Sequence, residues 1–125
     1  MVIDSDILID LFRDIEASKK FFLETKDKIW ISRVTAMEVT QGVKTKVSGV
    51  KAQKQISSLG IELIEVNETV SKIAWDIFYN YFHKTGIGIL DSFIAATALY
   101  KKTELVTRNV KHFKFIKGLE LIVPY

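Results

Sequence analysis

The sequence predicts an α/β fold, in which helices cover both faces of a central, mostly parallel sheet of four to five strands. Short apolar runs alternate with segments whose apolar residues recur at helical spacing, which is the pattern of strand–helix–strand units. The chain has 125 residues, the size of one domain, with 48% apolar and 26% charged residues, so disordered chains and coiled coils are excluded. We therefore expect a single three-layer α/β/α domain over residues 1–125.

In the first half of the chain, strand and helix signals follow one another closely. Met1 to Ile3 is a short apolar run that ends at a polar triplet. Ser5 or Asp6 in that triplet is expected to cap the next helix, because a short oxygen side chain accepts hydrogen bonds from first-turn amides. The elements expected up to residue 58 are a strand at 1–3, a helix containing Ile7, Leu8, Leu11 and Phe12, a helix at 15–25, a strand at 29–31 ending at Ser32, a helix from residue 33 and a weakly indicated helix at 44–58.

The second half contains the clearest helix of the chain. From Val70 to Phe82, apolar residues repeat at intervals of three and four behind Asn67, which is a favourable N-cap, and Gly86 and Gly88 end the unit. The other elements expected here are a strand at 61–64, a helix at 90–100 that is apolar on nearly all sides and therefore buried, a strand at 104–107 and a short strand at 119–123.

The composition excludes several kinds of protein. The chain has no cysteine, which rules out disulfide scaffolds, thiolate zinc sites and cysteine nucleophiles. The N-terminus lacks the pattern of a signal peptide, and no apolar run approaches the ~20 residues that span a bilayer. We therefore expect a soluble, cytoplasmic protein with no membrane partner. The formal net charge of +3 permits a nucleic-acid partner without proving one.

Acidic and polar residues follow the expected strands. In open parallel sheets, ligands bind beyond the carboxyl ends of the strands. Asp4 and Asp6 follow the first strand, and Glu38 lies two turns into the helix after the second. Thr107 and Asn109 follow the fourth strand. Taken alone, an aspartate at a strand–helix junction is more often a helix cap, and Glu38 alone is more often a solvated residue.

Asp91 is the most unusual of the acids, because it opens a helix that is otherwise apolar and buried. A bare buried carboxylate costs several kcal/mol, so Asp91 must be capped, paired or bound to a cation. If it gathered with Asp4 and Glu38 in one cleft, a divalent cation would be the simplest way to keep all three ionised. Oxygen ligands without cysteine favour Mg²⁺ or Mn²⁺ over zinc. The periodicity allows these acids to converge but does not show that they do.

Four motifs, in this order, resemble those of PIN-domain ribonucleases of the VapC toxin type, and the resemblance covers essentially the whole chain. They are Val2-Ile-Asp-Ser-Asp-Ile-Leu-Ile-Asp10, Ile31-Ser-Arg-Val-Thr-Ala-Met-Glu-Val-Thr-Gln-Gly42, Gly88-Ile-Leu-Asp-Ser-Phe-Ile-Ala-Ala-Thr-Ala98 and Leu105-Val-Thr-Arg-Asn-Val-Lys-His-Phe113. The third motif is the most specific. Each motif alone is a weak signal, whereas all four in order form a strong one.

The resemblance assigns roles to individual residues. It implies that Asp4, Glu38 and Asp91 are the catalytic, metal-binding acids. Asn109 stands where some members have a fourth acid, which implies that it orients water or a carboxylate and puts a second metal ion in doubt. Asp6, where many members have asparagine, would tune the cluster, and the hydroxyls of Ser5 and Thr107 would hold the carboxylates in position.

The resemblance also implies an activity and partners. It indicates a PIN-like fold and a toxin of a type II toxin–antitoxin pair. The toxin would be an endoribonuclease that hydrolyses RNA phosphodiester bonds with Mg²⁺ or Mn²⁺. Its implied partners are the RNA substrate, a cognate antitoxin and a second copy of the chain in a homodimer.

Basic residues near the acids are candidates for binding RNA. Lys44 and Lys46 come soon after Glu38, and Arg108 and Lys111 flank Asn109, so both groups are placed to contact phosphates beside the acids. For any single lysine, an ordinary solvated side chain is an equally good interpretation. His112, in the same segment as Asn109, is expected to form a structural hydrogen bond in preference to a catalytic role.

Other functions stay open. A PIN nuclease that processes RNA without being a toxin, and a catalytically inactive PIN module that binds RNA or protein, both fit the motifs. A more remote alternative is a haloacid-dehalogenase-type phosphatase, whose Asp-x-Asp loop resembles Val2 to Asp6. That class needs a further acidic motif, and Asp91 has no acidic neighbour three to five residues later.

Overall fold

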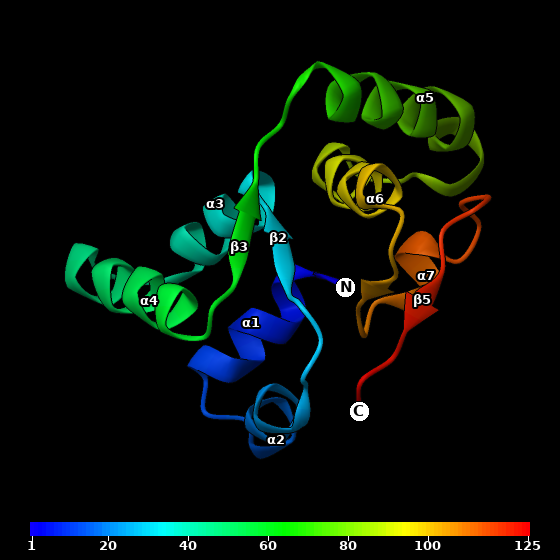
Figure 1. Cartoon of the computed structure of the whole chain (residues 1–125). Helices are drawn as coiled ribbons and strands as arrows, with labels where there is room; N and C mark the ends of the chain where they lie inside the picture. Colours follow the sequence, from blue (N-terminus) through cyan, green and yellow to red (C-terminus); the bar gives the residue numbers. More distant parts are fainter.

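The computed structural model describes all 125 residues, and its centre is a sheet of five parallel strands in the order β3-β2-β1-β4-β5 (Figure 1). All four strand pairings are parallel. The strands are β1 (Val2–Ile3), β2 (Trp30–Ser32), β3 (Glu62–Ile64), β4 (Leu105–Val106) and β5 (Leu121–Ile122). The central parallel sheet expected from the sequence is therefore confirmed.

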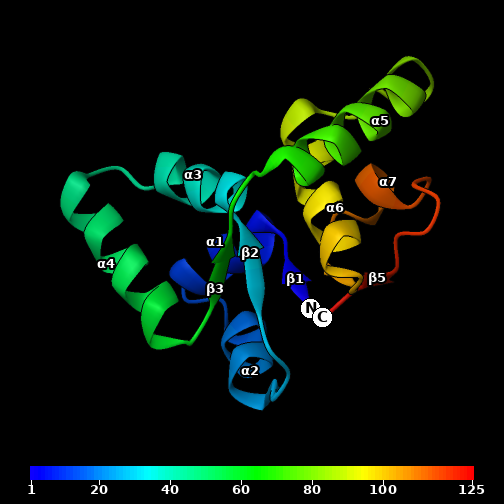
Figure 2. The same ribbon diagram turned by 45° about the horizontal axis from the view of Figure 1, so that its top comes forward.

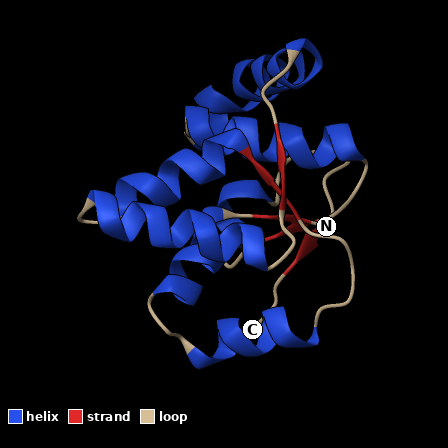
Figure 3. Ribbon diagram, turned by 60° about the vertical axis from the view of Figure 1, so that its left-hand side comes forward, coloured by secondary structure: helices blue, strands red, loops and turns tan.

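Seven helices flank the sheet in two groups (Figures 1 and 2). They are α1 (Ser5–Phe12), α2 (Glu16–Glu24), α3 (Arg33–Gly42), α4 (Lys46–Ser58), α5 (Glu68–Thr85), α6 (Ile89–Lys101) and α7 (Val110–Phe113). One hydrophobic core joins the sheet to α1, α2, α3 and α4. A second joins it to α5, α6 and α7, and Val34 of α3 also packs in it. The strands lie between these helical layers, as Figure 3 shows.

The two cores arise from the two-residue repeat of the strands. Successive side chains of a strand point to opposite faces of its sheet. Val2 and Leu105 accordingly pack in the core with α5 and α6, whereas Ile3 and Val106 pack in the core with α1 and α2. A strand that is buried on both faces needs apolar residues at successive positions. This explains why the strands appear in the sequence as continuous apolar runs.

Two local predictions need correction. The residue that caps α1 is Asp4 and not Ser5 or Asp6: its backbone is extended and its carboxylate accepts a hydrogen bond from the Ser5 N–H. The cap lies one residue earlier than expected because the helix begins immediately after the strand, at Ser5. The sequence also predicts no helix at α7, where the structure has one of four residues.

Other local predictions are confirmed. The weakly indicated segment over residues 44–58 forms α4, whose first turn is capped by Thr45. Asn67 caps α5, and Gly86 ends it with a positive φ of 67°, a conformation that favours glycine. None of the helices combines the length and the apolar character needed to cross a membrane.

Candidate active site

Four acids lie at the carboxyl end of the sheet, where the strand order changes direction between β1 and β4. Such switch points are where open parallel sheets bind ligands. Asp4 leaves β1 and Thr107 leaves β4, and the Asp4 N–H donates to the Val106 carbonyl at 2.9 Å. This pairing fixes the backbone on both sides of the switch point.

Asp4 is the most buried of the four acids, with 3% of its surface exposed. Its Oδ1 accepts from the Ser5 N–H at 2.7 Å, and its Oδ2 accepts from the Thr107 hydroxyl at 2.7 Å. Burial raises the pKa of Asp4 to about 7, and the neighbouring carboxylate of Asp6 adds to that rise. The hydrogen bonds from Thr107 and Ser5 oppose the rise in pKa, because they stabilise the charged form. The ionised form of Asp4 is therefore less favourable in the folded protein than that of an ordinary aspartate in water.

Asp6 lies beside Asp4 on the first turn of α1. The Arg108 N–H donates to Asp6 Oδ2 at 2.9 Å, whereas Asp6 Oδ1 is buried without a hydrogen-bond partner. Burial raises the pKa of Asp6, and the hydrogen bond from Arg108 lowers it in part. The residues after β4 thus bind both aspartates after β1.

Glu38 and Asp91 approach the same end of the sheet from α3 and α6. Burial raises the pKa of both side chains, and the charge of Asp91 further raises the pKa of Glu38. Glu38 Oε1 is buried and has no hydrogen-bond partner. Asp91 Oδ2 lies 3.1 Å from His112 Nδ1, and the His112 ring lowers the Asp91 pKa. The hydrogen-bonding role expected for His112 is therefore present, with Asp91 as its partner.

The donor chemistry of these acids fits a hard divalent cation. Their oxygens are the ligands that Mg²⁺ and Mn²⁺ prefer, and two buried carboxylate oxygens lack any partner within the protein. The charge of Asp91 raises the pKa of both Asp4 and Glu38, so Asp91 interacts electrostatically with each of the other two acids. Their side chains nevertheless do not form a group of three close enough to hold one ion together. Water molecules between the ion and the carboxylates would bridge this separation without direct contact from all three side chains.

Thr107 and Asn109, which follow β4, lie beside the acids. The Thr107 side chain is fully buried, and its oxygen accepts from the Asn109 N–H at 3.0 Å while donating to Asp4. The Asn109 side chain does not cap α7. Thr107 therefore connects the backbone of the Asn109 turn to the carboxylate of Asp4.

Replacing Thr107 by valine is expected to lower the free energy of unfolding by about 1–3 kcal/mol, because a buried carboxylate oxygen and an N–H lose their partner. Urea unfolding at pH 8 measures this change. Thr107→Ser, which keeps the hydroxyl, should stay closer to the wild type. Equal stability of the valine variant and the wild type would contradict the role assigned to Thr107.

The basic residues near the site differ in their surroundings. Arg108 is paired with Asp10, and its guanidinium lies 5.6 Å from the centre of the Tyr125 ring. The Tyr125 hydroxyl donates to the same Asp10 carboxylate at 3.0 Å. The sequence does not predict this cluster, because its members lie far apart in the chain. The exposed residues Lys44, Lys46 and Lys111 form no ion pair within the chain.

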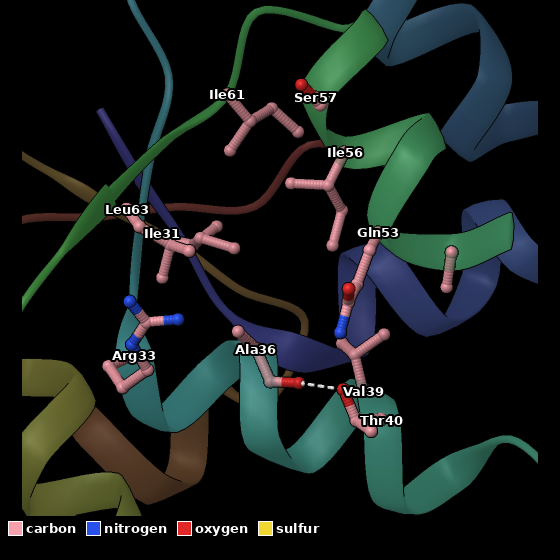
Figure 4. A pocket seen from close by; sticks show the side chains of 11 residues that line it. Ile31, Arg33, Ala36, Val39, Thr40, Gln53, Ile56, Ser57, Ile61 and Leu63 are labelled. Atoms are coloured by element: carbon pink, nitrogen blue, oxygen red, sulfur yellow. Dashed lines mark hydrogen bonds between the residues drawn. The ribbon is translucent and has the colours of Figure 1, made fainter. Parts of the chain in front are cut away.

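Two cavities of the protein differ in their relation to the acids. An apolar cavity of about 290 Å³ lies between α3, α4 and the edge of the sheet, and none of the four acids lines it (Figure 4). A cavity of about 490 Å³ lies beside α6 and α7 and includes Asp91 and His112 in its wall. The second cavity adjoins the acid cluster through Asp91.

Comparison with known proteins places these features in a family. A model of the PIN domain matches residues 1–118. "Ribonuclease VapC1" of Methanocaldococcus jannaschii is 32% identical over 97% of this chain and 84% of that protein, and "Ribonuclease VapC1" of Rickettsia felis is 31% identical over 98% and 94%. A solved toxin–antitoxin complex from Klebsiella pneumoniae contains a chain with a TM-score of 0.82 and 28% identity, covering 99% of this chain and 97% of that one. The chain belongs to the PIN-domain family and is a protein of the VapC type.

Proposed function

We propose that the chain is a single PIN domain over residues 1–125 that acts as a metal-dependent endoribonuclease, the toxin of a toxin–antitoxin pair. The observation that carries this proposal is the set of acids at the switch point of the sheet, of which Asp4 is buried and Glu38 and Asp91 are partly buried. The ribonuclease names of the relatives and the toxin–antitoxin title of the solved complex support it. A PIN nuclease that processes RNA without being a toxin would have the same site.

Asp4, Glu38 and Asp91 would hold Mg²⁺ or Mn²⁺, directly or through water. When bound, such an ion offsets the charge of the acids and activates a water molecule for in-line attack on the scissile phosphate. Thr107 and Ser5 hold the Asp4 carboxylate in one orientation, as their hydrogen bonds indicate. Asp6 and Asn109 flank this group, where they would tune its charge and orient water.

RNA contacts would come from basic residues on both sides of the acids. Lys44, Lys46 and Lys111 are exposed and unpaired, so their ammonium groups are available to phosphates. Arg108 is engaged with Asp10, so a contact with RNA would compete with that ion pair. An antitoxin is the second proposed partner, in keeping with the toxin–antitoxin complexes among the similar structures.

A second copy of the chain is the third proposed partner, and α5 offers a surface for it. Trp75 and Tyr79 are 61% and 68% exposed and lie side by side, with ring centres 5.7 Å apart. Trp75 also lines an apolar cavity of about 270 Å³ between α5 and α6. Exposed aromatic residues around an apolar cavity are typical of protein interfaces.

Replacing Trp75 by alanine is expected to weaken homodimer formation by roughly 30-fold or more, because a central interface tryptophan commonly contributes 2 kcal/mol or more. Analytical ultracentrifugation over a range of concentrations measures the dissociation constant. Leu23→Ala, which removes an apolar side chain that is 86% exposed on α2, is the matched control. A dimer unaffected by Trp75→Ala would exclude this surface.

Cleavage of RNA by the purified chain tests the proposed activity. The protein, free of antitoxin, is incubated with total RNA and Mg²⁺ or Mn²⁺, and in parallel with EDTA. Cleavage that requires the cation supports the nuclease, and the fragment ends identify the target sites. Absence of cleavage by folded protein would favour the inactive module that binds RNA or protein.

A further inference from the structure

The cavity beside Asp91 has features that the acid cluster does not explain. Its volume is about 490 Å³, within the roughly 300–1,000 Å³ range of small-molecule sites. Its wall consists of the loop between α5 and α6, the start of α6 and the segment around α7; the lining residues are Thr85, Gly86, Ile87, Gly88, Asp91, Lys111, His112 and Phe115. Because Asp91 belongs both to this wall and to the acid cluster, a molecule in the cavity lies next to the proposed site of cleavage.

The wall combines a cation with an aromatic ring. Lys111 is exposed and has no acidic partner within the chain, so its ammonium group is free to bind an anion. Phe115 is half-buried, and its ring packs against Tyr81 with centres 5.3 Å apart. The Tyr81 hydroxyl accepts from the Lys117 N–H at 3.1 Å, which ties the ring that supports Phe115 to the segment after α7. Phe115 is therefore held in a fixed position at the cavity.

The loop between α5 and α6 contributes two exposed glycines, Gly86 and Gly88, to the wall of the cavity. A Cβ atom placed on Gly86 would meet no atom within 4 Å, and one placed on Gly88 would meet only Asp91 Oδ2, at 3.8 Å. No other side chain therefore packs against either glycine at its Cα, apart from Asp91 beside Gly88. A cavity wall that combines exposed glycine backbone with an aromatic ring admits a flat, polar group such as a nucleobase.

We propose that this cavity binds one nucleotide of the RNA substrate next to the scissile phosphate, with Lys111 contacting a phosphate and Phe115 stacking on the base. The inference rests on the proposed ribonuclease function and adds a subsite to it. Lys111 and Phe115 touch a part of the substrate that does not react, so they contribute to binding and to the choice of cleavage site. Asp91 connects the subsite to the acids at which cleavage takes place.

Steady-state cleavage kinetics test this subsite. Loss of an interaction with a non-reacting part of the substrate raises KM and leaves kcat nearly unchanged. Lys111→Ala and Phe115→Leu are each expected to raise KM by about tenfold, the size of one lost phosphate contact or one lost stacking interaction. The leucine keeps an apolar side chain against Tyr81, so the variant retains its packing. Lys114→Ala removes an exposed lysine of the same segment that does not line the cavity, and it is expected to keep the wild-type KM.

Binding of a single nucleotide gives a readout that does not depend on cleavage. Adenosine and uridine 5′-monophosphate are each titrated into the wild-type protein without divalent cations, and amide shifts are followed by NMR. Shifts are expected at Gly86, Gly88, Lys111 and Phe115, and Lys111→Ala should weaken them while Lys114→Ala should not.

The two failures are distinguishable. If the wild type cleaves RNA and both Lys111→Ala and Phe115→Leu keep its KM, the subsite is overturned. Nucleotide-induced shifts confined to other parts of the chain would overturn it as well. In both cases the proposed nuclease function is unaffected. A wild-type protein that cuts no RNA with Mg²⁺ or Mn²⁺ would overturn the proposed function, and with it the assignment of the cavity as a substrate subsite, even if a nucleotide binds there.

Discussion

Asp91→Asn is expected to reduce cation-dependent RNA cleavage by about 100-fold or more, because losing one ligand of a catalytic cation removes several kcal/mol of transition-state stabilisation. Asparagine has the same shape as aspartate, and its amide can still form a hydrogen bond with His112. The fold should therefore persist, as circular dichroism and thermal unfolding can show. Initial rates of cleavage at saturating Mg²⁺ measure the loss.

Asp76→Asn is the matched control for this substitution. Asp76 is an exposed residue of α5 that forms no ion pair and lies outside the acid cluster. Its variant should keep the wild-type rate. Full activity of folded Asp91→Asn would remove Asp91 from the proposed catalytic group.

Asp4→Asn is expected to stabilise the cation-free protein at pH 8 by on the order of 2–4 kcal/mol. The pKa of Asp4 is about 7 in the folded protein, against an ordinary value of 3.8. Between these two pH values the folded state binds more protons than the unfolded state, so stability falls as the pH rises. Each pKa unit corresponds to about 1.4 kcal/mol, and the variant avoids this loss. Asparagine also serves as an N-cap, so α1 keeps its cap.

Urea unfolding at pH 5, 6, 7 and 8 in EDTA measures this effect. Burial also raises the pKa values of Asp6, Glu38 and Asp91, so these acids act in the same direction and the wild type should lose stability across the whole range. The difference between wild type and Asp4→Asn isolates the contribution of Asp4 and should grow from pH 5 to pH 8. Added Mg²⁺ should raise the free energy of unfolding of the wild type at pH 8, and it should not raise that of the Asp4→Asn variant. A wild type that gains stability toward pH 8 in EDTA would contradict the raised pKa.

Much of the fold was predictable because its signals are local. Apolar runs of three or four residues marked the strands, and the repeat from Val70 to Phe82 marked α5 together with its cap at Asn67. The prediction failed where the sequence signal was too short, or where several neighbouring residues gave the same signal. The four residues of α7 are too few for a helical repeat, and Asp4, Ser5 and Asp6 are all good cap residues, so only the observed start of α1 distinguishes them.

The sequence suggests residues for the candidate site but not the contacts among them. Asp4, Asp6 and Thr107 were singled out because they follow strands, and Asp91 because it interrupts an apolar helix. The partner of Arg108 was not foreseen, since Asp10 lies 98 residues earlier in the chain. The cavity that contains Lys111 and Phe115 was equally invisible, because three separate segments form it.

The sequence by itself determined the alternation of strands and helices, the chemistry of oxygen ligands without cysteine, and the motifs of the PIN-domain family. Periodicity and side-chain chemistry belong to neighbouring residues, and a single chain displays them directly. Only the tertiary structure decided which groups meet. The parallel pairing of β1 with β4 brings Thr107 to Asp4 across 103 residues, and the packing of α7 against α6 brings His112 to Asp91. Burial at this junction raises the Asp4 pKa to about 7. The tertiary structure decides this pKa, because burial depends on all the atoms that surround the carboxylate and not only on its neighbours in the chain.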